Sequence, residues 1–152
     1  MPLTDRWAEN LVDDDAALTR ILREARTIAV LGAKAQPSQP AHYVPAYLVR
    51  EGYRVRPVNP TLLGTRIHGE AVVPTLADLP EPVDVIDVFR RPAYLPGHAT
   101  EILALAWRPA VVWFQLGIRN DEAAERLARA GIRVVQDRCM MPDHRRLLRA
   151  SG

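Results

Sequence analysis

Five short apolar runs, each separated from the next by a segment with helical character, limit the folds open to this chain. The runs cover residues 27–31, 53–58, 83–89, 110–114 and 132–135. They are rich in β-branched and aromatic residues, which favours strands. Strands spaced roughly 25 residues apart with helices between them are typical of βαβ units, in which helices cover both faces of a parallel sheet. The sequence therefore predicts an α/β fold: a Rossmann-like, doubly wound parallel sheet of about five strands in a single domain.

Capping residues and helix breakers delimit the helices between these runs. The predicted helices cover residues 13–25, 42–51, 92–106, 120–130 and 142–150. Asn120 caps one helix and Gly131 ends it, and Pro45 is expected in the first turn of its own helix, where a missing N–H is tolerated. Residues 61–73 are predicted as a loop with one short strand. We divide the chain into a helical extension, 1–26, and a domain, 27–152.

The composition narrows the class of protein. Of the 152 residues, 48% are hydrophobic and 25% are charged, which is typical of a globular domain and argues against a disordered chain. Every apolar run is shorter than the roughly 18 residues that cross a bilayer, and the acidic first residues lack the apolar stretch of a signal peptide. The net charge is +2 and the arginines are scattered along the chain, which is not the pattern of a nucleic-acid surface. We therefore expect a cytoplasmic protein with no membrane or nucleic-acid partner.

Cysteine and histidine positions limit the chemistry. The single cysteine, Cys139, excludes an internal disulfide and a zinc cluster built from cysteines. His42, His68 and His98 lie in separate segments, so no metal site is predicted. Cys139 and His144 are five residues apart, which permits a nucleophile pair. The favoured alternative is that Cys139 acts as a small buried hydrophobic residue.

The loop after the first strand departs from the dinucleotide fingerprint. Sheets of this kind bind ligands at the carboxyl ends of their strands, so residues 32–40, GAKAQPSQP, are the first candidates. Only Gly32 of the pattern G-x-G-x-x-G is present, and Lys34 takes the place of the second glycine. Asn59 follows the second strand, where an NAD enzyme carries an acid for the ribose. Both departures argue against a standard NAD site, and Lys34 and Ser38 stay open as phosphate ligands or as solvated loop residues.

Polar residues also follow the third and fourth strands. Arg90 and Arg91 precede a predicted helix and together could hold a phosphate, although one of them is expected to face solvent. Gln115 follows the fourth strand, where it is predicted to line the ligand site together with the backbone near Gly117. The sequence therefore predicts a polar site at one edge of the sheet.

Other residues near the strand ends have predicted structural roles. Asp84 and Asp87 are placed on opposite faces of the third strand, so they do not form a carboxylate pair. Asp87 is expected to be buried and hydrogen-bonded, and Trp113 is expected in the core. Asp137 is expected to pair with Arg138.

Motifs at three strand ends carry a resemblance to a known family. They are PVNP at 57–60, DVFR at 87–90 and QLGI at 115–118. Each stands at the end of a predicted strand, and the three follow one another in the order found in that family. On the basis of these motifs, the chain resembles the CoA-binding domain family over about residues 27–148. It is most similar to the stand-alone, single-domain bacterial and archaeal members, which share their fold with the N-terminal domain of the succinyl-CoA synthetase α subunit.

The resemblance implies a coenzyme A site across the strand ends. It implies that the first loop surrounds the pyrophosphate, that the end of the second strand flanks the adenosine 3′-phosphate, and that the third and fourth strand ends form further walls. The residues concerned are, in that order, Gly32, Ala33 and Lys34; Val58, Asn59 and Pro60; Phe89 and Arg90; and Gln115, Leu116 and Gly117. Family members are expected to carry Arg-Pro-Ser near the first helix, but this chain has Gln39-Pro40-Ala41 there. Two phosphate ligands are therefore missing, and Lys34 is the residue that could compensate.

The resemblance also implies a function. It implies a protein that binds CoA or acyl-CoA without a complete active site of its own, and that senses, carries or delivers CoA. Neither the phosphohistidine domain of the synthetase nor the winged helix of related repressors is expected in this chain. A CoA- or NAD(P)-dependent enzyme, or a synthetase subunit acting with a partner chain, stays open as an alternative. A homo-oligomer also stays open, as does a redox role for Cys139 through a mixed disulfide with CoA.

Overall fold

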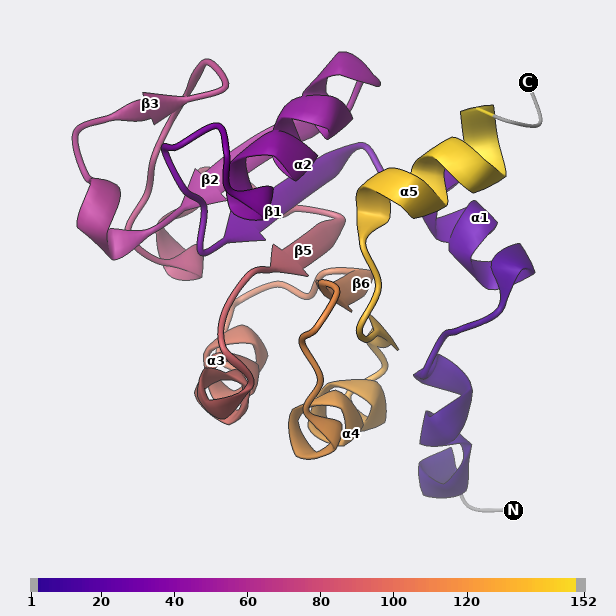
Figure 1. Ribbon diagram of the computed structural model, residues 1–152. Coiled ribbons are helices and arrows are strands. Elements are labelled where there is room, and N and C mark those ends of the chain that lie inside the picture. The colour runs from indigo at the N-terminus through magenta and orange to yellow at the C-terminus, as the bar shows by residue number, and fades with distance from the viewer. Residues whose placement is uncertain (1–2, 150–152) are drawn as a thin grey trace.

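The computed structural model describes residues 3–149 and confirms the predicted α/β architecture (Figure 1). Five parallel strands form one sheet in the order β2-β1-β5-β6-β7. Their bounds are β1 Thr27–Leu31, β2 Arg54–Val58, β5 Val85–Val88, β6 Val111–Phe114 and β7 Arg133–Val135. The chain steps from β1 outward to β2 and then crosses to β5 on the other side of β1. The topological switch therefore lies between β1 and β5, where open α/β sheets leave a crevice at the carboxyl ends of the strands.

Helices cover both faces of the sheet, in two layers (Figure 1). On one face lie α1 Asp15–Glu24, α2 Pro40–Arg50 and α5 Met140–His144, which continues as a π-helical segment, Arg145–Arg149; on the other lie α3 Leu95–Leu103 and α4 Asp121–Arg129. Short 3-10 helices cover Leu3–Asn10, Pro60–Leu62, Leu76–Asp78 and Pro92–Tyr94. Within the described residues, no helix combines the length and apolarity that crossing a membrane requires.

Residues of each strand alternate between two hydrophobic cores. Ile28 and Val30 of β1 pack on the α1 and α2 side, whereas Ala29 and Leu31 pack on the α3 and α4 side. All four are buried. This double burial explains why β1 is a continuous apolar run in the sequence.

Both edges of the sheet are covered by the chain itself. Leu11 forms a parallel bridge with Val134 beside β7, and Val73 forms one with Val58 beside β2. Helix α1 also packs into the same core as β1, through Leu18, Ile21 and Leu22. Each bridge joins one residue pair, so it blocks part of the edge strand from pairing with a further strand.

Helix α2 differs from its prediction. It begins at Pro40 rather than at residue 42, and Pro45 lies in its interior rather than in its first turn. Pro40 occupies the first helical position, where proline is favoured. Pro45 cannot donate a hydrogen bond to the carbonyl of Ala41, and the helix nevertheless runs on to Arg50. Pro45, Val44 and Leu48 are buried, so packing of this face stabilises a helix that the local preference would end earlier.

Three smaller differences concern short segments. Residues 61–73 hold two short strands instead of one, β3 Arg66–Ile67 and β4 Glu70–Ala71, which pair as an antiparallel hairpin. Asp84 lies just before β5 rather than on the strand, and its carboxylate accepts the N–H groups of Arg26 (2.8 Å) and Thr27 (3.1 Å). The last helix begins at Met140 rather than at residue 142, and its predicted end at residue 150 lies outside the described residues.

A candidate ligand-binding cleft

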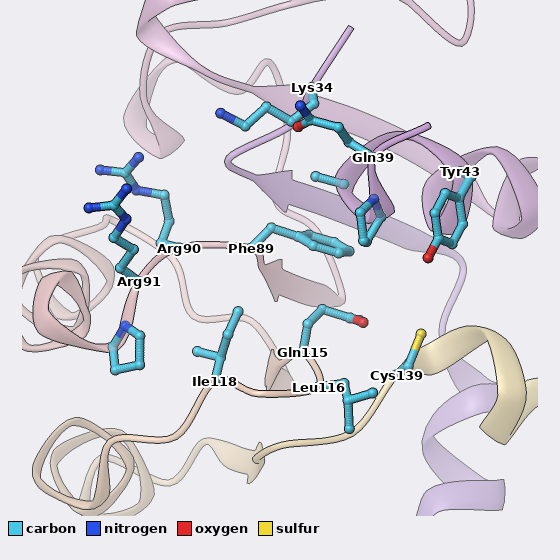
Figure 2. Close-up of a pocket in the computed structure, with 13 residues that line it drawn as sticks. Lys34, Gln39, Tyr43, Phe89, Arg90, Arg91, Gln115, Leu116, Ile118 and Cys139 are labelled. Atoms are coloured by element: carbon cyan, nitrogen blue, oxygen red, sulfur yellow. The ribbon is translucent and has the colours of Figure 1, made fainter. Parts of the chain in front are cut away.

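A cleft of about 480 Å³ opens at the carboxyl ends of β1, β5 and β6, on both sides of the topological switch (Figure 2). We call it the binding cleft. Its walls come from the first loop and the start of α2, from residues 89–92 after β5, from residues 115–118 after β6 and from the loop after β7. They are formed by Lys34, Gln39, Pro40, Ala41, Tyr43, Phe89, Arg90, Arg91, Pro92, Gln115, Leu116, Ile118 and Cys139.

A smaller depression of about 250 Å³ adjoins the binding cleft. The two share Lys34 and Gln39 as lining residues. The smaller depression is otherwise lined by Ala35, Gln36, Asn59, Thr61 and Leu62. A ligand longer than one depression could therefore pass along the first loop, beside Lys34.

Gly32 lets the first loop pass close to β5. Its φ is +92°, and a Cβ at this position would lie 2.6 Å from the carbonyl oxygen of Phe89. The N–H groups of Gly32 and Ala33 donate to the carbonyl of Val58 (2.9 and 3.3 Å), and Asn59 Nδ2 donates to the carbonyl of Ala33 (2.8 Å). These residues hold the shape of the loop, and only a glycine fits at its tightest point.

Arg90 is held in place by a chain of polar side chains. Its Nε donates to His98 Nε2 (3.2 Å), and His98 Nδ1 lies 3.0 Å from Glu101 Oε1. Because His98 Nε2 accepts, the proton of the neutral ring lies on Nδ1 and points to Glu101. This hydrogen bond lowers the pKa of Glu101 and keeps its carboxylate charged. The guanidinium of Arg90 also lies 4.6 Å from the ring centroid of Tyr94.

Positive charge gathers at one end of the binding cleft. The ammonium of Lys34 and the guanidinium groups of Arg90 and Arg91 all point to the same side of it, away from Cys139 (Figure 2). Arg90 is partly buried, whereas Lys34 and Arg91 are exposed. Such a group of cations is suited to phosphate groups.

The floor of the binding cleft contains a buried carboxamide and a buried acid. Gln115 is only 3% exposed, and its Nε2 donates to Oδ1 of Asp87 (2.6 Å). Asp87 is fully buried, as predicted, and its Oδ2 has no hydrogen-bond partner. Burial raises the pKa of Asp87 to about 8, so the carboxyl is mainly protonated at neutral pH.

Cys139 lies at the other end of the binding cleft, and its sulfur points toward the space between Tyr43 and Gln115 (Figure 2). Burial, reinforced by the nearby Asp87, raises the pKa of the Cys139 thiol. The imidazole of His144 is engaged elsewhere, because its Nδ1 lies 2.8 Å from the Tyr47 hydroxyl and forms no hydrogen bond with Cys139. The structure therefore does not form the Cys139–His144 nucleophile pair.

Two further expectations concern the fourth and fifth strand ends. The predicted pairing of Asp137 with Arg138 is wrong, because Arg138 Nε and Nη2 donate to both carboxylate oxygens of Asp143 (2.8 and 3.1 Å). Asp137 instead accepts the N–H of Gly117 (2.6 Å). Trp113 is fully buried, as predicted, with its indole N–H donated to the Arg138 carbonyl (2.7 Å).

The residues predicted for the site fall into three groups. Lys34, Phe89, Arg90, Gln115 and Leu116 line the binding cleft, and Asn59 lines the smaller depression. Those that shape the surrounding loops without lining either space are Gly32, Ala33, Val58 and Gly117. Ser38 and Pro60 are exposed and line neither space.

Several residues of this region were not predicted from the sequence. Tyr43 lies three residues after Pro40 on α2, so both face the binding cleft, and its 41% exposure is high for a tyrosine of a packed helix. Gln39 and Ile118 also line the cleft. The link from Arg90 to His98 joins a loop to a helix, and no local pattern predicts it.

Comparison with known proteins assigns the family. A model of the CoA binding domain matches residues 26–145, which is most of the chain. The chain belongs to the CoA-binding domain family. The matched segment contains every residue that lines the binding cleft and the smaller depression.

Two solved structures have the same fold as this chain, and a curated protein is similar in sequence. A structure described as cell-free ID.343 from Thermus thermophilus is 54% identical, with a TM-score of 0.85 over 90% of this chain and 100% of that chain. A crystal structure of the PH1109 protein redesigned for binding is 33% identical, with a TM-score of 0.84 over 91% of this chain and 94% of that chain. The uncharacterized protein YneT of Bacillus subtilis strain 168 is 35% identical over 129 residues, 85% of this chain and 93% of its own.

The described part of this CoA-binding domain was compared with the side-chain groupings that hold metal ions. Within residues 3–149, no three or more His, Cys, Asp or Glu side chains are grouped so that they could hold a metal ion. The polar groups of the binding cleft are instead cations, a carboxamide and a thiol, which are suited to an organic anion rather than to a metal.

Proposed function

We propose that this protein binds CoA or an acyl-CoA in the binding cleft and senses, carries or delivers it, without a complete active site of its own. The observation that carries the proposal is the polarity of the cleft. Its cations stand at one end, and apolar side chains line its middle. Its family, the CoA-binding domain family, supports the same ligand.

The chemistry of CoA matches this polarity. Its phosphates carry all its negative charge at the nucleotide end, and they fit Lys34, Arg90 and Arg91. Its long neutral arm fits the apolar wall of Phe89 and Leu116. We place the adenosine 3′-phosphate end in the smaller depression near Asn59, because that depression adjoins the cleft at Lys34. The close approach at Gly32 brings the loop that carries Lys34 up against the cleft wall.

Isothermal titration with CoA, 3′-dephospho-CoA and NAD tests the proposal. CoA is expected to bind most tightly, 3′-dephospho-CoA more weakly because it lacks one anionic group, and NAD weakest. Binding of NAD without binding of CoA would contradict the proposal.

Lys34 is expected to contribute a charge-assisted contact to a phosphate. Lys34→Ala should weaken CoA binding by about 1–3 kcal/mol, and Lys34→Arg should restore most of the loss. Arg20→Ala on α1 is the matched control, because Arg20 is exposed and lines neither the binding cleft nor the smaller depression. Titration at several salt concentrations completes the measurement, and an unchanged affinity of Lys34→Ala would place Lys34 outside the site.

An enzyme or enzyme subunit that uses CoA or NAD(P) is the alternative function. One observation favours it: Asp87 is a buried acid with a raised pKa below the cleft floor, and such groups are frequent at active sites. Incubation with acetyl-CoA and detection of released thiol tests this alternative. Turnover that is lost in Asp87→Asn would support an enzyme, and absence of turnover favours the binding protein.

A further inference from the structure

We propose that Cys139 captures CoA as a mixed disulfide, by thiol–disulfide exchange with the disulfide form of CoA. This inference rests on the proposed function, because the binding cleft must first hold the CoA moiety. It adds a covalent modification site to a binding site. It also predicts that the Cys139 thiol reacts faster with CoA disulfide than with glutathione disulfide.

The polarity of the cleft orients such a ligand. Lys34, Arg90 and Arg91 point to one side of the cleft, and Cys139 lies on the opposite side, beyond Phe89 (Figure 2). In CoA the charged phosphates and the sulfur stand at opposite ends of the molecule. A ligand whose phosphates contact the cations therefore extends its sulfur toward Cys139.

Gln115 provides an independent sign of a ligand beside Cys139. Its side chain is 97% buried, since only 3% is exposed, and its Nε2 is committed to Asp87. Within residues 3–149 no group donates to Gln115 Oε1, which points into the cleft toward the side of Cys139 (Figure 2). The oxygen is therefore an open acceptor at the surface of the cleft, available to a donor of a bound ligand. The arm of CoA carries amide N–H groups that could donate to this oxygen.

The exchange step balances without any further reagent. The Cys139 thiol loses its proton to solvent, and the thiolate attacks one sulfur of CoA disulfide. The sulfur–sulfur bond of CoA disulfide breaks as the bond between Cys139 and one CoA forms. The other CoA leaves as a thiolate and takes up a proton. Cys139 is thereby oxidised, and the CoA that leaves is reduced.

The environment of Cys139 makes this reaction selective. Burial and Asp87 raise the pKa of the thiol, although the N–H of Met141 bonds to the sulfur and opposes the shift. A thiol that is mainly protonated reacts slowly with disulfides that collide with it by chance. A disulfide held in the cleft reacts faster, because its sulfur stays close to Cys139.

Mass spectrometry of the intact protein under non-reducing conditions tests the inference. The wild-type protein is incubated with CoA disulfide or, at equal concentration, with glutathione disulfide. We expect one CoA per chain, released by dithiothreitol, forming at least about tenfold faster than the glutathione adduct, which corresponds to an activation free energy lower by about 1.4 kcal/mol. Release by dithiothreitol shows that the link is a disulfide, and the absence of an adduct in Cys139→Ser would place it at Cys139.

Lys34→Ala separates capture through the binding cleft from simple thiol reactivity. This variant should slow the reaction with CoA disulfide, while its reaction with a small neutral methanethiosulfonate should match that of the wild type. Equal rates with CoA and glutathione disulfides would overturn the inference. So would a free Cys139 thiol in a protein that binds reduced CoA in calorimetry, which leaves the proposed function standing. Absence of CoA binding in calorimetry would overturn the proposed function itself.

Discussion

Asp87→Asn is expected to raise the free energy of unfolding by about 4 kcal/mol at pH 7. In the folded protein, burial holds the carboxyl protonated by raising its pKa from 3.8 to about 8, whereas in the unfolded chain the group is ionised at pH 7. Folding must therefore bind a proton at a pH where the free carboxyl releases it. Asparagine has nearly the same shape, can accept the N–H of Gln115 and binds no proton on folding.

The pH dependence of the wild-type protein follows from the same shift. Below about pH 4 both states hold the proton, and Asp87 contributes no pH dependence. Between about pH 4 and pH 8 the unfolded chain binds fewer protons than the folded protein, so the contribution of Asp87 lowers the free energy of unfolding as the pH rises. Above about pH 8 both states are ionised and the contribution levels off. Asp87→Asn should remove this slope.

Urea unfolding of both proteins from pH 4 to pH 9 measures the effect. Asp143→Asn is the matched control, because Asp143 is also buried but accepts hydrogen bonds from Arg138 and Arg146. Removing its charge should destabilise the protein by about 1–3 kcal/mol, the opposite sign. If Asp87→Asn also destabilised the protein at pH 7, Asp87 would be ionised in the folded state.

Gly32→Ala is expected to destabilise the protein by about 2–4 kcal/mol and to weaken CoA binding. One part of the cost is the φ of +92°, which residues with a Cβ rarely adopt. The other part is the contact of the new Cβ with the Phe89 carbonyl, 2.6 Å away, which belongs to rigid backbone. Relief of this contact would move the first loop or residues 89–92, and both form walls of the binding cleft.

Gly131→Ala separates the two parts of this cost. Its φ is +89°, nearly that of Gly32, but no atom lies within 4 Å of the position that a Cβ would occupy. This control should cost about 1–2 kcal/mol, from the backbone alone, and should leave CoA affinity unchanged. Thermal unfolding and calorimetry measure both quantities. Equal effects of the two substitutions would show that the close approach at Gly32 is unimportant.

The strands and the end of the sheet that holds the cleft could be predicted from local patterns. The central strands β5 and β6 are buried along their whole length, and the other strands are mostly buried, so their apolar residues are visible in the sequence. Parallel strands have their carboxyl ends at one edge, so the sequence alone assigns Lys34, Arg90 and Gln115 to that edge. Pro45 shows the limit of local patterns, because burial of its helix face outweighs the local preference of proline.

The choice among several possible hydrogen-bond partners of one side chain could not be predicted. Arg138 bonds with Asp143 and not with its neighbour Asp137, because α5 turns Asp143 back onto it. His98 reaches Arg90 from α3, and the same helix carries Glu101, which completes the chain that holds the guanidinium. Side chains of these types have several polar groups of suitable chemistry elsewhere in the sequence. Only their positions in space select among them.

The sequence by itself determined the α/β class, the parallel sheet, the loops that carry the site and the family resemblance. These follow from hydrophobic periodicity and short motifs, which act over a few residues. Only the tertiary structure decided that the cations stand at one end of the cleft and Cys139 at the other, and that Gln115 turns its oxygen toward the cleft above a buried Asp87. The reason is physical: charge, burial and hydrogen bonding depend on distances between elements, and those distances are set by the packing of the helices on the sheet.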